Sequence, residues 1–230
     1  MGERSIVALG GGGFSDEDPS LDDFILGLAR SPRPKVCFLG TASGDSDSYI
    51  TLFYDAFTRR DCLPSHLKLF ATPERAAVHA HLLAQDIVYV GGGNTANMLA
   101  VWRLHGVDAV LREAWEAGTV LAGVSAGANC WFEACTTDSF GPMGALHEGL
   151  GFLPGSFCPH YDVEPERRPT FLRLVAEGLP GGYAAEDHVG VHFRGTDFTE
   201  AVTSREGGQA FRVEFRDGDA LETLLTVRRL

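Results

Sequence analysis

Short apolar runs alternate along the chain with longer segments whose apolar residues recur every three or four positions. The apolar runs are SIVALG (5–10), KVCFLG (35–40), LKLF (67–70), DIVYVGGG (86–93) and TVLAGV (119–124), and the segments with a helical period are 48–60, 73–85, 94–104 and 107–118. Strands that are apolar at every position are typical of a parallel sheet buried on both faces. The pattern predicts an α/β fold in which a mainly parallel sheet is flanked by helices on both faces, with functional groups at the carboxyl ends of the strands.

The pattern changes near residue 183, after which the apolar pieces are short and separated by glycine and aspartate. These pieces are VGVHF, FTEAV, AFRVEF and LLTVRR. They predict antiparallel C-terminal strands that extend the sheet or lie along its edge. The chain shows no internal repeat, no low-complexity run and no clear linker, and its 230 residues suit a single domain over residues 1–230.

The composition and net charge argue against membranes and nucleic acids as partners. Hydrophobic residues make up 44% of the chain and charged residues 22%, as in ordinary globular proteins, and no apolar run approaches the ~18 residues that a membrane span needs. The first residues, MGERSIVALGGGG, are typical of a first strand rather than of a signal peptide, so we expect a cytoplasmic protein. The 19 basic and 31 acidic residues give a net charge of -12, which repels nucleic acid and anionic membrane surfaces.

Nothing in the sequence predicts a metal or a cofactor. Five cysteines without a C-x-x-C spacing argue against both a disulfide framework and a zinc cluster. The stretch GGGGF (10–14) follows the first predicted strand, where dinucleotide-binding folds carry a glycine-rich loop, but Ser15 replaces the last glycine and the acidic residues 16–18 would face a pyrophosphate. A tight turn that supports the floor of an active site is the better interpretation.

The stretch AGVSAGA (122–128) places a serine directly after an apolar run. A strand that turns sharply into a helix presents its corner side chain at the top of the sheet, and glycines two positions before and after the corner avoid a clash. Gly123, Ser125 and Gly127 have this G-x-S-x-G spacing. Ser125 is therefore a candidate nucleophile.

A second glycine-rich stretch, GGGNT (91–95), closes the fourth apolar run. Asn94 or Thr95 caps the predicted helix that follows. Glycines leave backbone N–H groups uncovered, and such groups at the carboxyl edge of a sheet stabilise a developing oxyanion. We select the N–H groups of Gly92 and Ala126 as oxyanion donors. The alternative interpretation of GGGNT is a simple strand-to-helix turn without a catalytic role.

A nucleophilic serine needs a base and a carboxylate that orients the base. His160, in GSFCPHYD, follows a short apolar piece and is the best-placed histidine, although a structural histidine also fits that context. The candidate carboxylates are Asp138, Asp162, Glu186 and Asp187, and spacing alone does not choose among them.

Taken together, GVSAGAN, the earlier VGGGNT, and the later TTDS, PHYD and acidic pair resemble the peptidase E family of serine peptidases, which includes aspartyl dipeptidases and cyanophycinases. The resemblance runs from about residue 5 to about residue 195. It implies a three-layer sandwich similar to class I glutamine amidotransferases, with Ser125 as nucleophile and His160 as base. It further implies a short peptide substrate, no cofactor, and a homodimer.

The family's third catalytic residue falls on Glu186 or Asp187. Aligning the apolar residues that follow favours Asp187, and His188 then stands where the family usually has glycine. By the same resemblance, Asp138 and Ser139 line the site.

The resemblance also implies a substrate site. The aspartyl dipeptidases of the family use an arginine downstream of the histidine to bind an N-terminal aspartate, which here points to Arg167, Arg168 or Arg173. Asn94 is a further candidate contact. Only Arg173 comes close to the family's spacing, and a solvated helix start explains the other two equally well. The expected activity is removal of residues from the N-terminus of short peptides by a dipeptidase that favours N-terminal aspartate.

Two other functions fit parts of the sequence. An α/β-hydrolase-type esterase shares the serine motif, but its chain order would require His188 or His192 as base. In a non-catalytic amidotransferase-like binding domain, Ser125 would merely cap the helix that follows it.

Overall fold

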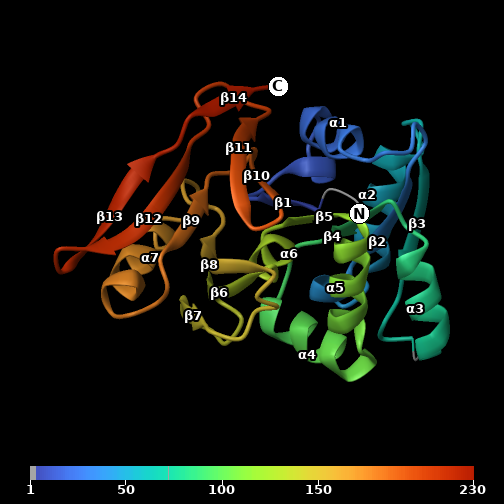
Figure 1. The fold of residues 1–230 in the computed structure, drawn as a ribbon, viewed down its shortest axis with the longest axis horizontal. Helices are drawn as coiled ribbons and strands as arrows, with labels where there is room; N and C mark the ends of the chain where they lie inside the picture. Colours follow the sequence, from blue (N-terminus) through green and yellow to red (C-terminus); the bar gives the residue numbers. More distant parts are fainter. Residues whose placement is uncertain (1–3, 72) are drawn as a thin grey trace.

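The computed structural model describes residues 4–71 and 73–230 and contains two β-sheets with helices packed against them (Figure 1). The helices of the described part are α1 (Ser20–Gly27), α2 (Asp47–Phe57), α3 (Arg75–Leu83), α4 (Thr95–His105), α5 (Val107–Ala117), α6 (Ala126–Asn129) and α7 (Arg167–Ala176), with short 3-10 turns η1 (Gly13–Ser15) and η2 (Thr41–Ser43). Among these residues no helix combines the length and the apolar character that crossing a bilayer requires.

The first sheet has a parallel centre. Its strand order is β14 (Val227–Arg229), β11 (Asp197–Thr203), β10 (Val189–Arg194), β1 (Ser5–Leu9), β5 (Val120–Val124), β4 (Ile87–Val90), β2 (Lys35–Leu39) and β3 (Leu63–Leu67). Strands β1, β5, β4, β2 and β3 are parallel, whereas β10 runs antiparallel to β1 and β11 antiparallel to β10. The carboxyl ends of β1, β5 and β4 therefore meet at one edge.

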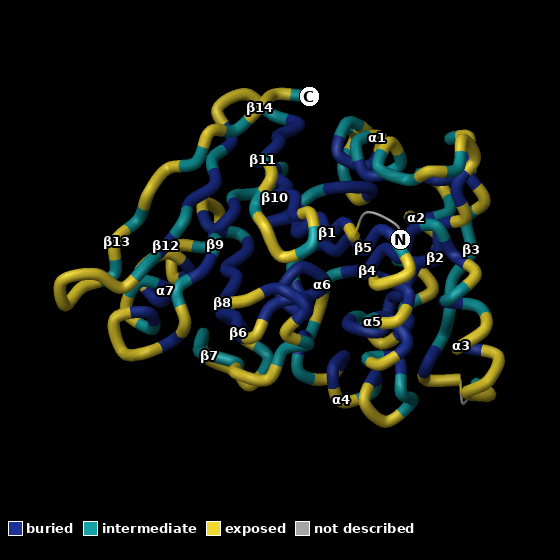
Figure 2. Tube along the Cα trace, in the orientation of Figure 1, coloured by how far each residue is buried: buried dark blue, intermediate teal, exposed yellow. Residues whose placement is uncertain are grey.

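Alternating side chains of the central strands pack into two apolar cores, one on each face of the sheet. In β1, Ile6 and Ala8 pack into a core shared with helices α3 to α5, and Val7 and Leu9 pack into a core shared with α1 and α2. Figure 2 shows the strands at the centre of the sheet as buried. Helices cover both faces, and the predicted three-layer α/β sandwich is confirmed.

A second sheet, which the sequence did not predict, lies beside the first. Its order is β13 (Asp219–Leu224), β12 (Ala210–Arg216), β9 (Gly182–Ala185), β8 (Leu153–Cys158), β6 (Phe132–Thr137) and β7 (Gly144–Leu146). Strands β6, β8 and β9 are parallel, and β7, β12 and β13 are antiparallel to their neighbours. Helix α7 packs against it through Phe171 and Val175.

The C-terminal tail is divided between the two sheets. Strands β10 and β11 extend the first sheet as expected, but β9, β12 and β13 belong to the second, so the expectation of strands added only to the first sheet or its edge was wrong in this part. Aromatic packing joins the two sheets. Phe193 of β10 makes edge contacts with Phe132 and Tyr183 of the second sheet, and Tyr183 stacks on Phe198 of β11.

One predicted strand is displaced along the chain. The run LKLF (67–70) was expected as a strand, but β3 spans Leu63–Leu67 and the chain leaves the sheet at residue 68. Strand β3 is the outermost strand and pairs only with β2, so its sequence LPSHL includes a proline and polar residues that a central strand would exclude. Because few residues of β3 are apolar, the hydrophobic pattern of the sequence did not reveal this strand.

Candidate active site

Ser125 occupies the corner between β5 and α6, two elements labelled near the centre of Figure 1. Its backbone has φ 56° and ψ -114°, a conformation that non-glycine residues rarely adopt and that often marks functional sites. Its side chain makes no capping hydrogen bond to α6. The serine is therefore held at the corner by the fold and not by a role as helix cap.

Two glycines let α6 return over the sheet. A Cβ atom on Gly123 would lie 2.1 Å from Gly127 O, and one on Gly127 would lie 2.3 Å from Val90 O, in the neighbouring strand β4. Both approaches are shorter than real Cβ contacts allow. The glycine spacing of the sequence motif thus reflects direct backbone packing at the corner.

We expect Gly127→Ala to destabilise the protein by about 3 kcal/mol, because the added methyl group would push α6 away from β4. The measurement is the free energy of unfolding in denaturant. Gly27→Ala is the matched control, since Gly27 also lies in a helix and a Cβ there meets nothing within 4 Å. Equal effects of the two substitutions would contradict this account of the corner.

The end of β1 brings the other candidate groups to Ser125. Leu9 O accepts the Ser125 N–H at 3.1 Å, Gly10 O accepts the His160 N–H at 3.2 Å, and Gly11 O accepts the His188 N–H at 3.2 Å. Three consecutive carbonyls thus bind the nucleophile segment, the base segment and the acidic segment. The stretch GGGGF serves this assembly, because a Cβ on Gly11 would lie 2.1 Å from Asp187 Oδ1.

His160 and Asp187 form a close pair. His160 Nδ1 lies 2.7 Å from Asp187 Oδ1, and both side chains are about one-fifth exposed, at 21% and 23%. His160 has φ 53°, so it too is held in a left-handed conformation. Within the described residues no hydrogen bond joins Ser125 Oγ to His160. Such bonds commonly tighten only when substrate binds.

The other candidate carboxylates have different partners. Glu186 Oε2 lies 2.7 Å from Arg205 Nη2 and accepts the Gln209 N–H at 3.0 Å. Asp162 Oδ1 accepts the Asp187 N–H at 2.9 Å, and its Oδ2 lies 2.7 Å from Arg205 Nη2. Asp138 is exposed. Of the acids that the sequence left open, Asp187 is the one whose carboxylate reaches His160.

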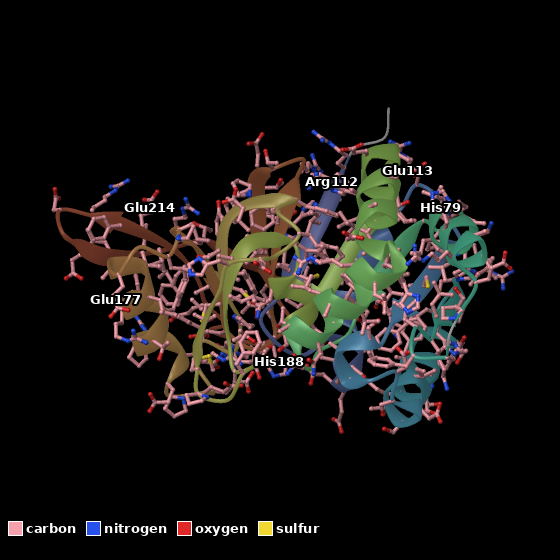
Figure 3. All side chains as sticks on the ribbon, turned by 90° about the horizontal axis from the view of Figure 1, so that it is seen from below. His79, Arg112, Glu113, Glu177, His188 and Glu214 are labelled. Carbon is pink, nitrogen blue, oxygen red and sulfur yellow. The ribbon has the colours of Figure 1, made fainter. Side chains whose placement is uncertain are left out.

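The two histidines that an esterase would need lie in other surroundings. His188, labelled in Figure 3, has φ 65°, in the left-handed region that favours glycine, and its Nδ1 lies 2.8 Å from Asp16 Oδ2. Burial raises the pKa of Asp16, and the nearby His188 opposes that shift. His192 is fully buried within β10, with its Nε2 3.4 Å from Ser5 Oγ.

The candidate oxyanion donors differ in their present partners. Ala126 is the first residue of α6, so its N–H has no acceptor within that helix. The Gly92 N–H donates to Tyr49 Oη at 3.2 Å. Burial raises the pKa of Tyr49, which keeps its hydroxyl protonated. Gly92 lies beside the serine, since a Cβ there would be 3.9 Å from Ser125 Oγ.

Asn94 makes structural hydrogen bonds with both ends of its side chain. Its Oδ1 accepts the Asn97 N–H at 2.8 Å and caps α4, and its Nδ2 donates to Ser139 O at 3.0 Å. Ser139 Oγ in turn accepts the Ala96 N–H at 3.2 Å. These bonds fasten the loop after β6 to the loop that carries Gly92.

Each candidate substrate arginine is paired with a glutamate. Arg167 is buried and binds Glu164 at 2.7 Å, Arg168 binds Glu222 at 2.8 Å, and Arg173 binds Glu177 at 2.6 Å. Figure 3 labels Glu177 and His188, which lie well apart in that view. None of the three arginines donates a hydrogen bond to Ser125, His160 or Asp187 within the described chain.

Two residues next to the site escaped the sequence analysis. Tyr49 lies on α2 and Arg205 on the loop after β11, and neither belongs to a motif. Their roles depend on contacts between distant segments, so no local signal could have found them. In residues 4–71 and 73–230, no group of three or more His, Cys, Asp or Glu side chains is arranged to hold a metal ion.

Residues 6–201 match the sequence model of Peptidase family S51. The chain is 49% identical over 230 residues to a Bacillus subtilis (strain 168) protein described as the uncharacterized peptidase YgaJ, with 99% of each chain covered. It is 26% identical over 202 residues to the uncharacterized peptidase Lmo0363 of Listeria monocytogenes, covering 84% of this chain and 95% of that protein.

A solved structure shares the fold. The crystal structure of a peptidase from an acI-B1 actinobacterium superposes with a TM-score of 0.70 at 17% sequence identity, covering 98% of this chain and 95% of the other. At that identity the likeness concerns the arrangement of strands and helices.

Proposed function

The chain belongs to peptidase family S51, and from this premise we propose that it hydrolyses short peptides with Ser125 as nucleophile, His160 as general base and Asp187 as the residue that orients His160. The observation that carries the proposal is the set of three bonds at the end of β1. Leu9, Gly10 and Gly11 hold the segments of the serine, the histidine and the acid side by side.

The chemistry follows from these positions. Ser125 Oγ attacks the carbonyl carbon of the peptide's N-terminal residue while its proton passes to His160 Nε2. The protonated imidazole, stabilised by Asp187 at Nδ1, gives that proton to the leaving amine as the C–N bond breaks. His160 then takes a proton from the water that attacks the acyl carbonyl, and it returns this proton to Ser125 Oγ as the acyl C–O bond breaks and the acid product leaves.

The oxyanion is stabilised by the N–H groups of Gly92 and Ala126, each contributing about 3 kcal/mol to the transition state. The substrate carbonyl takes the place of Tyr49 Oη as acceptor for the Gly92 N–H.

The finer part of the proposal is a dipeptidase that favours N-terminal aspartate. It is supported by the family resemblance and requires one arginine to exchange its glutamate for the substrate carboxylate. Arg168 suits this exchange better than Arg167, because Arg167 is buried. A cytoplasmic location and a homodimer remain expectations from the sequence.

The test of substrate class is hydrolysis of a peptide series by the wild-type protein and by Ser125→Ala. The series is Asp-Leu, Glu-Leu, Asn-Leu, Ala-Leu, Asp-Ala-Leu and N-acetyl-Asp-Leu. We expect Asp-Leu to be cleaved with a kcat/KM at least about tenfold above that of Asn-Leu. Broad cleavage that depends on Ser125 would overturn the aspartate preference and leave the catalytic assignment standing.

The two neighbouring acids are expected to respond differently to loss of charge. Asp187→Asn should lower kcat by about 10⁴-fold, because an amide fails to hold the imidazole in the required tautomer. Glu186→Gln should retain kcat within about tenfold, since Glu186 binds Arg205 and Gln209 rather than His160. Steady-state kinetics of both variants on one peptide decides the assignment. The reverse ranking would transfer the orienting role to Glu186.

Neither rival function is favoured by these contacts. The esterase order requires His188 or His192, but the first binds Asp16 and the second is fully buried. The binding-domain alternative requires Ser125 to cap α6, yet its side chain makes no capping bond.

A further inference from the structure

The loop between β11 and β12, residues 204–209, wraps around the segment that carries Asp187. At its start, the Ser204 N–H donates to His188 O at 3.0 Å. At its end, Gln209 O accepts the Glu186 N–H at 3.1 Å, and the Gln209 N–H donates to Glu186 Oε2 at 3.0 Å. The loop is thus fastened on both sides of Asp187.

Arg205 extends from this loop to both carboxylates that flank the proposed catalytic acid. One nitrogen, Nη2, lies 2.7 Å from Asp162 Oδ2 and 2.7 Å from Glu186 Oε2. Asp162 uses its other oxygen to accept the Asp187 N–H at 2.9 Å. A continuous path of hydrogen bonds therefore runs from Arg205 through Asp162 to the backbone of Asp187 and on to His160.

Asp162, Glu186 and Asp187 form a carboxylate cluster whose mutual repulsion Arg205 offsets. Burial alone would raise the pKa of Asp162, but hydrogen bonds from the Asp187 N–H and from Arg205 outweigh it, so the pKa lies below its usual value. For the cationic Arg205, burial by itself lowers the pKa. Its bonds to Asp162 and Glu186 outweigh that effect, so the pKa of Arg205 is raised.

Other charged groups face the carboxylate cluster from neighbouring elements. Asp16 adds a negative charge near Asp187, and the His188 ring lies against Asp16, with Nδ1 2.8 Å from its Oδ2. Arg168 of α7 acts on Glu186 from a greater distance while it binds Glu222. These groups stay in place when Arg205 is replaced, so the replacement leaves the cluster with a net gain of negative charge.

We propose that Arg205 is a positioning residue of the active site: it holds Asp162 and Glu186 in place, and through them it keeps the Asp187 carboxylate against His160. The inference rests on the proposed roles of Asp187 and His160. Arg205 touches neither the serine nor the oxyanion donors, so its loss should lower kcat and leave KM nearly unchanged.

The test compares Arg205→Ala, Arg205→Gln and Arg205→Lys with Arg229→Ala. Arg229 is a matched control because it lines the same surface cavity of about 400 Å³ as Arg205 but contacts Thr203 O and Asp18 instead. We expect Arg205→Ala and Arg205→Gln to lower kcat by about 10- to 100-fold with KM within about threefold. Arg229→Ala should match the wild type.

Arg205→Lys should recover most of the lost activity. A single nitrogen makes both contacts, so a lysine ammonium can reproduce them. Because Arg205 lines an open cavity, added guanidinium should also restore part of kcat in Arg205→Ala and none in Asp187→Asn. If lysine and alanine variants are equally impaired, the positioning role is wrong.

The pH dependence of kcat distinguishes a positioning role of Arg205 from a merely structural one. Without Arg205 the more negative cluster favours the protonated imidazole, so the acidic limb of the kcat profile should move up by about half a pH unit to one unit. NMR titration of the His160 ring should show the same displacement, without any need for turnover. An unchanged titration overturns the inference even if activity falls.

The two proposals fail in different ways. If the wild-type protein cleaves no peptide, the proposed function fails, and the NMR titration still tests Arg205. If the wild type is active and depends on Ser125, while Arg205→Ala keeps the wild-type rate and pH profile, the positioning role alone is overturned.

Discussion

Ser125→Ala should reduce kcat on a cleaved peptide by about 10⁶-fold, because the covalent route is lost together with the hydroxyl. What remains should come from the oxyanion donors and substrate binding, which still accelerate hydrolysis by about 10³- to 10⁴-fold over water. The substitution leaves the corner intact, since the Ser125 side chain makes no bond that shapes α6. The free energy of unfolding should therefore change little.

Ser43→Ala is the control for loss of a hydroxyl at the same edge of the sheet. Ser43 belongs to η2, directly after β2, and its Oγ donates to Gly40 O. Its kcat should match that of the wild type. A Ser125→Ala protein that retained most of the wild-type rate would remove the serine from the mechanism.

His160→Ala should lower kcat by a similar factor, about 10⁵- to 10⁶-fold, because the substitution removes the base that accepts the serine proton. His188→Ala should retain kcat within about tenfold, since His188 contributes to the site through its backbone and binds Asp16 with its ring. Steady-state kinetics of the two variants, with circular dichroism to verify folding, separates the peptidase order of residues from the esterase order.

A large loss in His188→Ala combined with an active His160→Ala would reverse the assignment. His188→Gly refines the comparison, because glycine suits the positive φ at this position. We expect His188→Gly to be at least as stable as His188→Ala.

The sequence predicted the parallel core because its signal is local. The central strands are mostly apolar and buried on both faces, and β1 shows why: alternate side chains enter different cores on the two faces. The serine corner was predictable for a similar reason, since the G-x-S-x-G spacing of Gly123, Ser125 and Gly127 lies within five residues, although the packing that requires Gly127 involves Val90 of β4.

The choice among the acids needed contacts that no local pattern contains. Asp187 and Glu186 are adjacent, and only the bonds from Asp162, Arg205 and Gln209 decide which carboxylate turns toward His160. The family resemblance favoured Asp187, whereas the residues alone left the question open.

The second sheet was missed for a related reason. Strands β6 and β8 have polar or glycine residues within their apolar runs. They pair with each other, and β8 also pairs with β9, far along the chain. Tyr49 could not be found for the same reason, because it is one of two tyrosines in the amphipathic helix α2 and nothing in that pattern indicates its contact with Gly92.

The most direct test of the central claim is to locate the acyl group during turnover. The protein would be mixed with an ester of the amino acid that the peptide series shows to be preferred, quenched in acid, and mapped by peptide mass spectrometry. The account predicts one acyl group on the Ser125 hydroxyl in the wild type, a larger amount in Asp187→Asn if deacylation slows, and none in Ser125→Ala. An acyl group on any other residue, or wild-type turnover of the ester by Ser125→Ala, would contradict it.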